Sequence, residues 1–397
     1  MKTLIRDVQL IWEHGIRKAA WLLFEGPVIT DTGWEGKPEP QQSDRIVEGG
    51  GKYLAPGLID IHLHGGNGYD FMDGTEKAVH EIAAYHSAHG ITSMLATTLA
   101  GEEMETLKAL GQIKKTAPEV KCCNLLGVHL EGPYFSQNQR GAQDPKYIRD
   151  PDPAQCERFL ETGCIRRISL APELPGAMDL AKMLYARGVL VSAGHTDADY
   201  DIIQQAFSHG FRLMTHLYSG MSVVHRKGPF RYGGAVEGGL LTDGMAVELI
   251  SDGCHLPGCL LKLVRRCKKA EKIILITDAM RGAGLKEGEW TRLGSLERGQ
   301  KVIIEDGVAK MPDRTSFAGS VASGDRVVRT MRDLGEVPLH EAVAMMTVNP
   351  ARLLGLEKSK GGLKPGMDAD MILFDEDIAM QAVWVGGRCV FSAGVGN

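Results

Sequence analysis

The chain has 397 residues, of which 43% are hydrophobic and 24% charged, and its formal net charge at pH 7 is −5. This composition is ordinary for a globular protein, and the length allows one large domain with a smaller one beside it. The acidic balance, without a basic stripe, argues against nucleic acid as a partner. The N-terminus shows no signal-peptide core, and no apolar run is long enough to span a bilayer. We therefore expect a cytoplasmic protein without membrane contact.

Short strands separated by turns are predicted at the start of the chain, at Thr3–Ile11, Arg17–Phe24 and Arg45–Glu48. From Pro56 onward, apolar runs of strand length alternate with helix-like segments. The helix-like segments are Thr75–His89, Gly101–Thr116, Ala177–Arg187, Asp199–His209 and Gly258–Lys269. Such repeated alternation predicts a parallel sheet, which is either doubly wound or closed into a (β/α)8 barrel.

The tail of the chain departs from this alternation. A turn-rich joint at Gly361–Gly366 precedes three short predicted strands, at Asp370–Phe374, Gln381–Val385 and Cys389–Phe391. Strands at both ends of the chain suggest that the two termini meet in one small β domain beside the parallel sheet.

The segment Asp60–His64 closes the apolar run that begins at Tyr53. On a strand alternate side chains share a face, so Asp60, His62 and His64 point the same way. Two imidazoles side by side at a strand end make half of a metal site. Hydrogen-bonded core histidines are the alternative interpretation of this short motif taken alone.

Polar residues end several other apolar runs, and this repetition favours the metal site. The residues at the six run ends are His62 with His64, Glu131, His195, His216, His255 and Asp278. In a parallel barrel the carboxyl ends of all strands open on one face, so these residues would converge. Burying unpaired charges and imidazoles is costly, and a bound cation removes that cost.

The predicted ligand set is four imidazoles and two carboxylates, which suits zinc or a similar divalent ion. These six ligands are His62, His64, Glu131, His195, His216 and Asp278. They are too many for one tetrahedral site and suit two ions that share a carboxylate, for which Glu131 is the natural candidate. Asp278 is the natural general base. His129 faces the same side as Glu131, and either a supporting role or simple packing is open for it.

These strand ends, taken together, resemble N-acetylglucosamine-6-phosphate deacetylases of the amidohydrolase superfamily. The matching segments are Pro56–Gly66, Gly127–Tyr134, Gly194–Ala198, Thr215–Tyr218, Asp252–His255, Ile276–Met280, Ala318–Ser320 and Pro365–Asp370. The resemblance covers nearly the whole chain in order, and the sequences HLEGP and GHTDA are its most specific parts.

The resemblance implies a (β/α)8 TIM barrel with a small β-sandwich domain formed by both termini. The expected division is residues 1–55 plus 358–397 for the β domain and 56–357 for the barrel. It implies removal of the N-acetyl group from N-acetylglucosamine 6-phosphate, giving glucosamine 6-phosphate and acetate. It also implies a homodimer with two divalent ions per subunit, Zn²⁺ first, with Fe²⁺ or another divalent ion as alternatives.

By position, the resemblance makes Glu131, His195 and His216 the metal site shared within the family and Asp278 the catalytic aspartate. The retained His62 and His64 place the chain in the two-metal branch. The residues expected to bind substrate are Gln143, Ser219, Gly220, Arg226, His255, Gly319 and Ser320.

The departures from the family pattern fall in the expected phosphate pocket. Ser219 stands where the family commonly has asparagine. Arg226 keeps its place, while Lys227 and Arg231 add positive charge that could compensate. These departures leave open which sugar phosphate is the substrate, whereas they do not bear on the type of reaction. The glycine-rich segment Gly282–Gln300 is a candidate lid.

Three alternatives stay open at this point. The first is a deacetylase of another N-acetylhexosamine, either N-acetylgalactosamine 6-phosphate or an unphosphorylated sugar. The second is another amidohydrolase, such as a cyclic amide hydrolase, although many of those relatives have a carbamylated lysine where this chain has Glu131. The third is a non-catalytic barrel scaffold, which would be expected to lose the metal ligands that this chain keeps.

Overall fold

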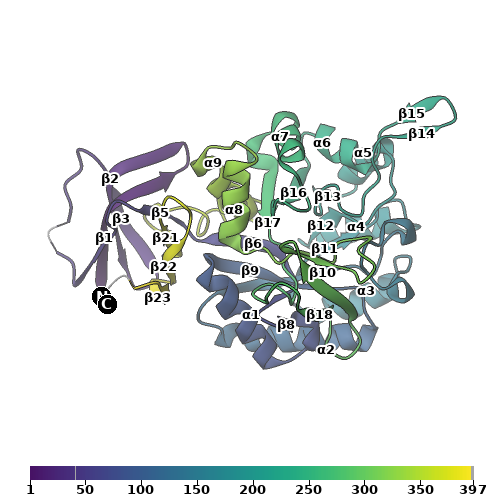
Figure 1. Ribbon diagram of the computed structural model, residues 1–397, viewed down its shortest axis with the longest axis horizontal. Coiled ribbons are helices and arrows are strands. Elements are labelled where there is room, and N and C mark those ends of the chain that lie inside the picture. The colour runs from purple at the N-terminus through teal and green to yellow at the C-terminus, as the bar shows by residue number, and fades with distance from the viewer. Residues whose placement is uncertain (41, 395–397) are drawn as a thin grey trace.

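The fold is that of a computed structural model, which describes residues 1–40 and 42–394 (Figure 1). Eight parallel strands and their helices form a (β/α)8 barrel, and strands from both ends of the chain form a second sheet beside it. The barrel confirms the closed form of the two parallel architectures that the strand–helix alternation allowed. No helix in the described part of the chain is long and apolar enough to cross a membrane.

The barrel strands follow one another in chain order around the sheet. They are β6 (Leu58–Leu63), β9 (Ile91–Thr98), β10 (Asn124–Glu131), β11 (Ile165–Leu170), β12 (Leu190–Ala193), β13 (Phe211–Met214), β16 (Ala246–Ile250) and β17 (Ile273–Ile276). Every neighbouring pair is parallel. Just beyond β17, the backbone N–H of Asp278 donates to the carbonyl of His62 at 2.9 Å, which brings the last strand against the first.

Helices surround the barrel. They are α1 (Glu76–Ala88), α2 (Glu103–Thr116), α3 (Pro153–Leu160), α4 (Ala177–Ala186), α5 (Tyr200–Ser208), α6 (Ala235–Leu241), α7 (Gly258–Cys267), α8 (Gly324–Asp333), α9 (Leu339–Ala344) and α10 (Val348–Leu353). The five helices expected from sequence are α1, α2, α4, α5 and α7. The others lay outside the sequence prediction because they are short or carry many charges, as α8 does.

The second sheet joins the two ends of the chain, shown purple and yellow at the left of Figure 1. Its strands are β1 (Lys2–Trp12), β2 (Gly15–Glu25), β3 (Val28–Gly33), β4 (Arg45–Glu48), β5 (Tyr53–Pro56), β21 (Met371–Phe374), β22 (Met380–Val385) and β23 (Arg388–Ser392). β5 pairs antiparallel with β21, and this pairing unites the termini. The meeting of the two ends was predicted; strand β3 was not.

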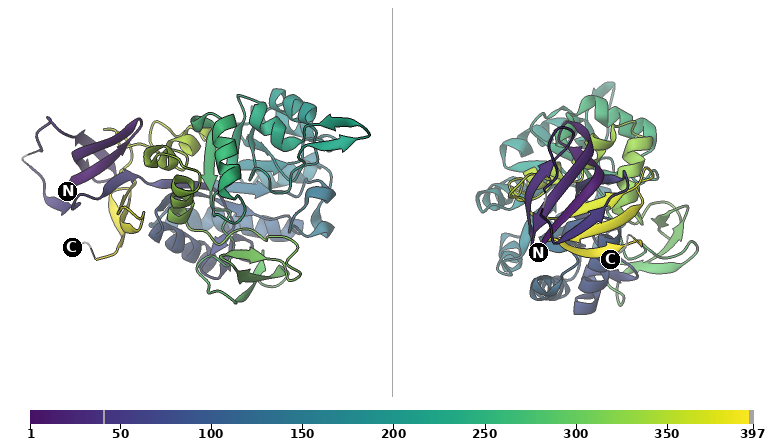
Figure 2. Two further views of the ribbon diagram at one scale, coloured as in Figure 1. Left: turned by 45° about the horizontal axis from the view of Figure 1, so that its top comes forward. Right: turned by 90° about the vertical axis from the view of Figure 1, so that its left-hand side faces the viewer.

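Three smaller antiparallel units lie outside these two sheets, and the shortest is the pair of β7 (Gly65–Gly66) and β8 (Tyr69–Asp70). β14 (His225–Lys227) and β15 (Phe230–Tyr232) form a hairpin that projects at the end opposite the terminal sheet (Figures 1 and 2). β18 (Trp290–Leu293), β19 (Gln300–Glu305) and β20 (Val308–Lys310) form a three-stranded sheet. The predicted lid segment therefore includes β18 and the start of β19, and its motion stays a prediction.

Candidate active site

The six predicted metal ligands lie at the carboxyl ends of five barrel strands. His62 is the next-to-last residue of β6, His64 directly follows that strand, and Glu131 is the last residue of β10. The others follow the ends of strands: His195 after β12, His216 after β13 and Asp278 after β17. All six are buried. Parallel strands in a closed barrel open on the same face, and this is why residues from distant parts of the sequence meet here.

Glu131 lies at the centre of this cluster. Its Oε1 is 3.0 Å from His216 Nε2, 3.3 Å from His62 Nε2 and 3.4 Å from His195 Nε2. Its Oε2 is 3.5 Å from His64 Nε2. One carboxylate therefore reaches all four predicted histidine ligands, which is the arrangement that a shared ligand between two ions would need.

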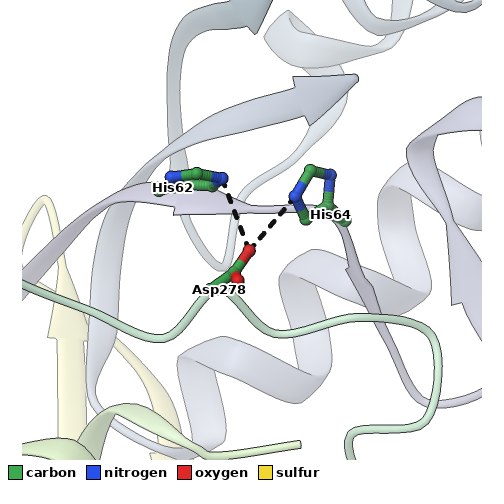
Figure 3. A group of neighbouring side chains, drawn as sticks. All are labelled: His62, His64 and Asp278. Atoms are coloured by element: carbon green, nitrogen blue, oxygen red, sulfur yellow. Dashed lines mark ion pairs between the residues drawn. The ribbon is translucent and has the colours of Figure 1, made fainter. Parts of the chain in front are cut away.

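Asp278 approaches His62 and His64 from the end of β17, the strand that lies against β6 where the barrel closes. Its Oδ1 lies 3.2 Å from His64 Nε2 and 3.4 Å from His62 Nε2 (Figure 3). Potential ligand atoms of His62, His64 and Asp278 all lie within 4.8 Å of one another, as do those of His62, Glu131 and His216. Two overlapping triads that share an imidazole suit a pair of neighbouring cations.

Three of these residues have a left-handed backbone. The φ angles are 48° at His195, 27° at His216 and 47° at Asp278. Residues with side chains rarely adopt this conformation, and it is typically retained where a functional site requires it. Each of the three is the second residue after the end of a barrel strand, so the turn in the backbone redirects its side chain at the strand end.

The donor atoms fit a divalent metal. His62 Nε2 is buried and makes no hydrogen bond within the described residues, although carboxylate oxygens of Glu131 and Asp278 lie near it. A buried imidazole nitrogen among carboxylates is costly unless a cation, either a proton or a metal ion, lies between them. The nitrogen and oxygen ligand set, without thiolate, is one that zinc and similar divalent ions accept.

The electrostatics of the cluster favour added positive charge. Burial opposes a charged imidazole, but Glu131 and Asp278 outweigh it and raise the pKa of His62 to about 10. Burial likewise opposes ionised carboxylates, but the surrounding histidines outweigh it and hold the pKa values of Glu131 and Asp278 below their usual range. A site that stabilises protons on imidazoles in this way also stabilises a metal cation.

A buried ion pair inside the barrel supports the histidines, and sequence reasoning missed it. Glu248 on β16 accepts from Arg167 Nη2 on β11 at 2.9 Å, and both side chains are fully buried. The same Oε2 atom of Glu248 lies 3.3 Å from His62 Nδ1 and accepts from the backbone N–H of His216 at 3.1 Å. The available signal was a glutamate within the apolar run Met245–Ile250.

Gln143 supports the central carboxylate. Its Nε2 donates to Glu131 Oε2 at 2.7 Å, and its Oε1 accepts from the backbone N–H of Ala100 at 3.0 Å. The second contact fixes which end of the amide faces Glu131. His129 instead lies beside the cluster, with its ring edge-to-face against His62 and its Nε2 2.7 Å from Ser169 Oγ.

A cavity of about 220 Å³ opens over the cluster. Of the residues expected to bind substrate, Gln143, Ser219, Gly220, His255 and Gly319 line it. His255 is held by Asp252, whose Oδ2 is 2.8 Å from His255 Nδ1. Leu99, Leu293, Ser316 and Phe317 also line the cavity and were not expected from sequence.

Gly220 lies where a larger residue would not fit. Its φ is 57°, and a Cβ atom there would come within 2.8 Å of His195 Nδ1. The backbone at this position can therefore approach the His195 ring closely, which brings the Ser219–Gly220 turn to the wall of the cavity.

Two expected substrate residues do not line this cavity. Arg226 is exposed on the projecting β14–β15 hairpin. Ser320 is fully buried, and its backbone N–H donates to the carbonyl of Asp278 at 2.9 Å. Phosphate binding by Arg226 stays a prediction, while Ser320 contacts the backbone that carries Asp278.

The fold and the cluster at the strand ends are those of a metal-dependent hydrolase built on a (β/α)8 barrel. The sequence pattern of the Amidohydrolase family matches residues 53–392. The chain belongs to the amidohydrolase family.

Similar proteins within this family are named for a more specific activity. The chain is 37% identical over 345 residues to an N-acetylglucosamine-6-phosphate deacetylase of Lysinibacillus sphaericus, covering 86% of each chain. It is 32% identical over 375 residues to an N-acetylgalactosamine-6-phosphate deacetylase of Escherichia coli O157:H7, covering 91% of this chain and 97% of that one. A solved structure of a Mycobacterium smegmatis N-acetyl-D-glucosamine-6-phosphate deacetylase mutant, in complex with N-acetyl-D-glucosamine-6-phosphate, is 30% identical. It superposes with a TM-score of 0.89 over 99% of both chains.

Proposed function

We propose that this protein removes the N-acetyl group from N-acetylglucosamine 6-phosphate, giving glucosamine 6-phosphate and acetate. The observation that carries the proposal is the gathering of His62, His64, Glu131, His195, His216 and Asp278 at one mouth of the barrel. The relatives named as deacetylases of hexosamine 6-phosphates support the choice of an acetamide on a phosphorylated sugar.

The cluster would hold two divalent ions, which we propose to be zinc. One would be bound by the triad of His62, His64 and Asp278, and the other by Glu131 with His195 and His216. When bound, such ions make water acidic and polarise an amide carbonyl. The buried Nε2 atom of His62, which lies near two carboxylates but makes no hydrogen bond within the described residues, supports this assignment.

Asp278 has the chemistry of the proton carrier. Its lowered pKa keeps the carboxylate ionised near neutral pH, so it can accept a proton from the attacking water. The same carboxyl group can then pass that proton to the departing amine of the sugar, which leaves acetate and the free amine. Gln143 uses one amide hydrogen on Glu131, and its second is available to the acetamide oxygen.

The remaining cavity residues would orient the sugar. Asp252 fixes the His255 ring, which leaves the other ring nitrogen for a sugar hydroxyl. Ser219 and Gly220 lie beside the cluster, where a hydroxyl and a backbone N–H can face the phosphate. Arg226 would add a guanidinium fork for the phosphate, and we propose this role for it on chemical grounds alone.

A second candidate substrate is N-acetylgalactosamine 6-phosphate. One specific observation favours it: a relative with that name matches 91% of this chain. Ser219 stands where an asparagine was expected in the phosphate part of the cavity, and this difference leaves the identity of the sugar phosphate open.

The test is acetate release from four substrates: N-acetylglucosamine and N-acetylgalactosamine, each with and without the 6-phosphate. We expect the highest kcat/KM for N-acetylglucosamine 6-phosphate and loss of activity after chelation, restored by added zinc. A higher value for the galacto isomer would select the second candidate. Turnover that survives full metal removal would contradict the metal assignment, and equal rates without phosphate would contradict the phosphate assignment.

We also propose a cytoplasmic homodimer, with the terminal β domain of residues 1–55 and 358–397 distinct from the barrel of 56–357. Two exposed apolar side chains support a partner surface: Val224, directly before β14, is 54% exposed, and Phe230, on β15, is 67% exposed. Light scattering on the purified protein measures the oligomeric state directly, and a monomer at micromolar concentration would contradict the dimer.

A further inference from the structure

A second cavity, of about 330 Å³, lies at the amino ends of the barrel strands. Its walls come from the first residues of β11, β12, β13, β16 and β17 and from α10. The candidate active site occupies the carboxyl ends, so this cavity opens at the other end of the barrel. None of the residues proposed for deacetylation lines it.

Positive charge dominates the lining of this amino-end cavity. The lining contains four cationic side chains and one carboxylate, that of Glu271. The four cations are Arg166, Arg212, Lys272 and Arg352. Within residues 1–40 and 42–394, none of the four forms an ion pair with a carboxylate. The chain as a whole has a net charge of −5, so carboxylates are plentiful elsewhere. Unpaired cations gathered at one cavity repel one another, and an anion bound among them would relieve that repulsion.

Contacts with the protein order the guanidinium group of Arg212. Its guanidinium carbon lies 4.4 Å from the ring centroid of Tyr185 and 4.7 Å from that of Phe207. Its Nη1 donates to the carbonyls of Phe207 at 2.7 Å and Phe211 at 2.8 Å. These contacts occupy one nitrogen of the guanidinium and leave its other N–H groups without a protein partner in the described part of the chain. A side chain already ordered in this way loses little entropy when it binds an anion.

The other cations are free to converge on the same ligand. Among the residues that the structure describes, Lys272 Nζ donates to the carbonyl of Gly244 alone, at 3.2 Å. Arg166 and Arg352 are exposed and make no side-chain hydrogen bond or ion pair with the residues that the structure describes. The apolar side chains of Leu190, Ile274 and Leu353 complete the lining and would cover carbon atoms of a bound molecule.

We propose that the amino-end cavity binds a small molecule that carries a phosphate group. Arginine recognises phosphate through paired, charge-assisted hydrogen bonds, and three of the four cations here are arginines. The volume lies in the range of small-molecule sites, about 300–1,000 Å³. The phosphate could be free inorganic phosphate or a phosphate ester on a sugar-sized carbon skeleton. This site is separate from the proposed deacetylase site and does not depend on it.

The experiment is calorimetric titration of the holoenzyme with inorganic phosphate and, in a second arm, with glucose 6-phosphate. The test variant is R166E/R352E, which reverses two exposed cations at the cavity. The control variant is R45E/R388E, which makes the same charge change on exposed arginines of the terminal sheet. We expect the test variant to weaken phosphate binding about tenfold or more, and the control variant to bind like the wild type.

The two arms distinguish the sources of the phosphate group. Tighter binding of glucose 6-phosphate, lost in R166E/R352E, would assign a phosphate ester; equal binding of the two probes would assign the free anion. The milder R166Q/R352Q variant repeats the test if charge reversal impairs folding, which thermal unfolding without phosphate reveals. Absence of phosphate binding in the wild type, or equal loss in the test and control variants, would overturn the proposal.

Discussion

Arg167 Nη2 donates to Glu248 Oε2 at 2.9 Å across the inside of the barrel, and both side chains are fully buried. The pair lies directly behind His62, whose Nδ1 is 3.3 Å from the same oxygen. A buried carboxylate that orients an imidazole fixes which ring nitrogen faces the metal cluster, and this contact also increases the basicity of the imidazole.

Replacing Arg167 alone should destabilise the protein strongly. Arg167→Met leaves Glu248 buried without its counter-charge, and we expect a loss of about 3–5 kcal/mol in the free energy of unfolding. The matched control, R167M/E248L, removes both charges and should recover much of that loss, yet bind less metal because His62 has lost its partner. Urea unfolding and metal analysis measure the two effects. Equal stability of the single and double variants would contradict the assignment.

Asp278→Asn tests the proton carrier. The amide keeps the shape of the side chain but accepts no proton from water, so we expect kcat to fall by about 10²–10⁴. At least one ion should remain, because the histidines and Glu131 are unchanged. Steady-state acetate release and metal content per chain are the measurements. Near-wild-type turnover would remove Asp278 from its proposed role.

Gln143→Leu tests whether the amide that contacts Glu131 supports catalysis. The change removes the 2.7 Å hydrogen bond to Glu131 and leaves the backbone N–H of Ala100 without its acceptor. We expect kcat/KM to fall by about 10–100-fold, as is common when a group that orients a metal ligand is lost. Gln143→Asn provides a control of the same chemistry with a shorter reach. Unchanged kcat/KM in the leucine variant would assign Gln143 a packing role.

His86 should make stability depend on pH. Burial lowers its pKa to about 4, and its Nε2 lies 2.9 Å from the carbonyl of Gly65, which the neutral ring satisfies as donor. Between pH 6.5, the ordinary pKa of histidine, and about pH 4, the pKa of His86 in the folded protein, the unfolded chain binds a proton that the folded chain does not. The free energy of unfolding therefore falls as the pH drops through this range. Between pH 6.5 and 5 the loss is about 1.5 kcal/mol.

His86→Gln keeps a donor for Gly65 and has no proton to gain. Urea unfolding of this variant should therefore show a smaller loss between pH 6.5 and 5 than the wild type, although both lose metal as ligands protonate. Comparing apo proteins at each pH removes that shared effect. Identical pH dependence of the two apo proteins would mean that His86 does not control it.

Arg226→Ala tests the phosphate prediction. Arg226 is exposed on the β14–β15 hairpin, so its loss should leave stability within about 0.5 kcal/mol of the wild type. We expect KM for N-acetylglucosamine 6-phosphate to rise several-fold, with the rate on the unphosphorylated sugar unchanged, because only the phosphate contact is lost. An unchanged KM would redirect the role to Lys227 or Arg231. Steady-state kinetics on both sugars provide the measurement.

The amino-acid sequence alone predicted the strand–helix alternation and the polar residues at strand ends. It did so because strand and helix periodicities are local, and because a charged or imidazole side chain after an apolar run is visible without tertiary contacts. His62, His64, Glu131, His195, His216 and Asp278 were all found in this way. The resemblance to a family supplied Gln143 and the substrate-binding role of His255, and both residues line the cavity.

Only the tertiary structure decided how residues on separate strands face one another. Arg167 and Glu248 look like ordinary interruptions of apolar strands, and barrel closure alone places both on the inside, within hydrogen-bonding distance. The same closure brings four cations to the amino-end cavity, although their segments carry no shared motif. Arg226 shows the converse: its sequence position led us to expect it at the phosphate, but the hairpin holds it outside the cavity of its own chain. Local pattern determines which way a side chain points along its own strand, whereas distances between strands depend on how the barrel closes.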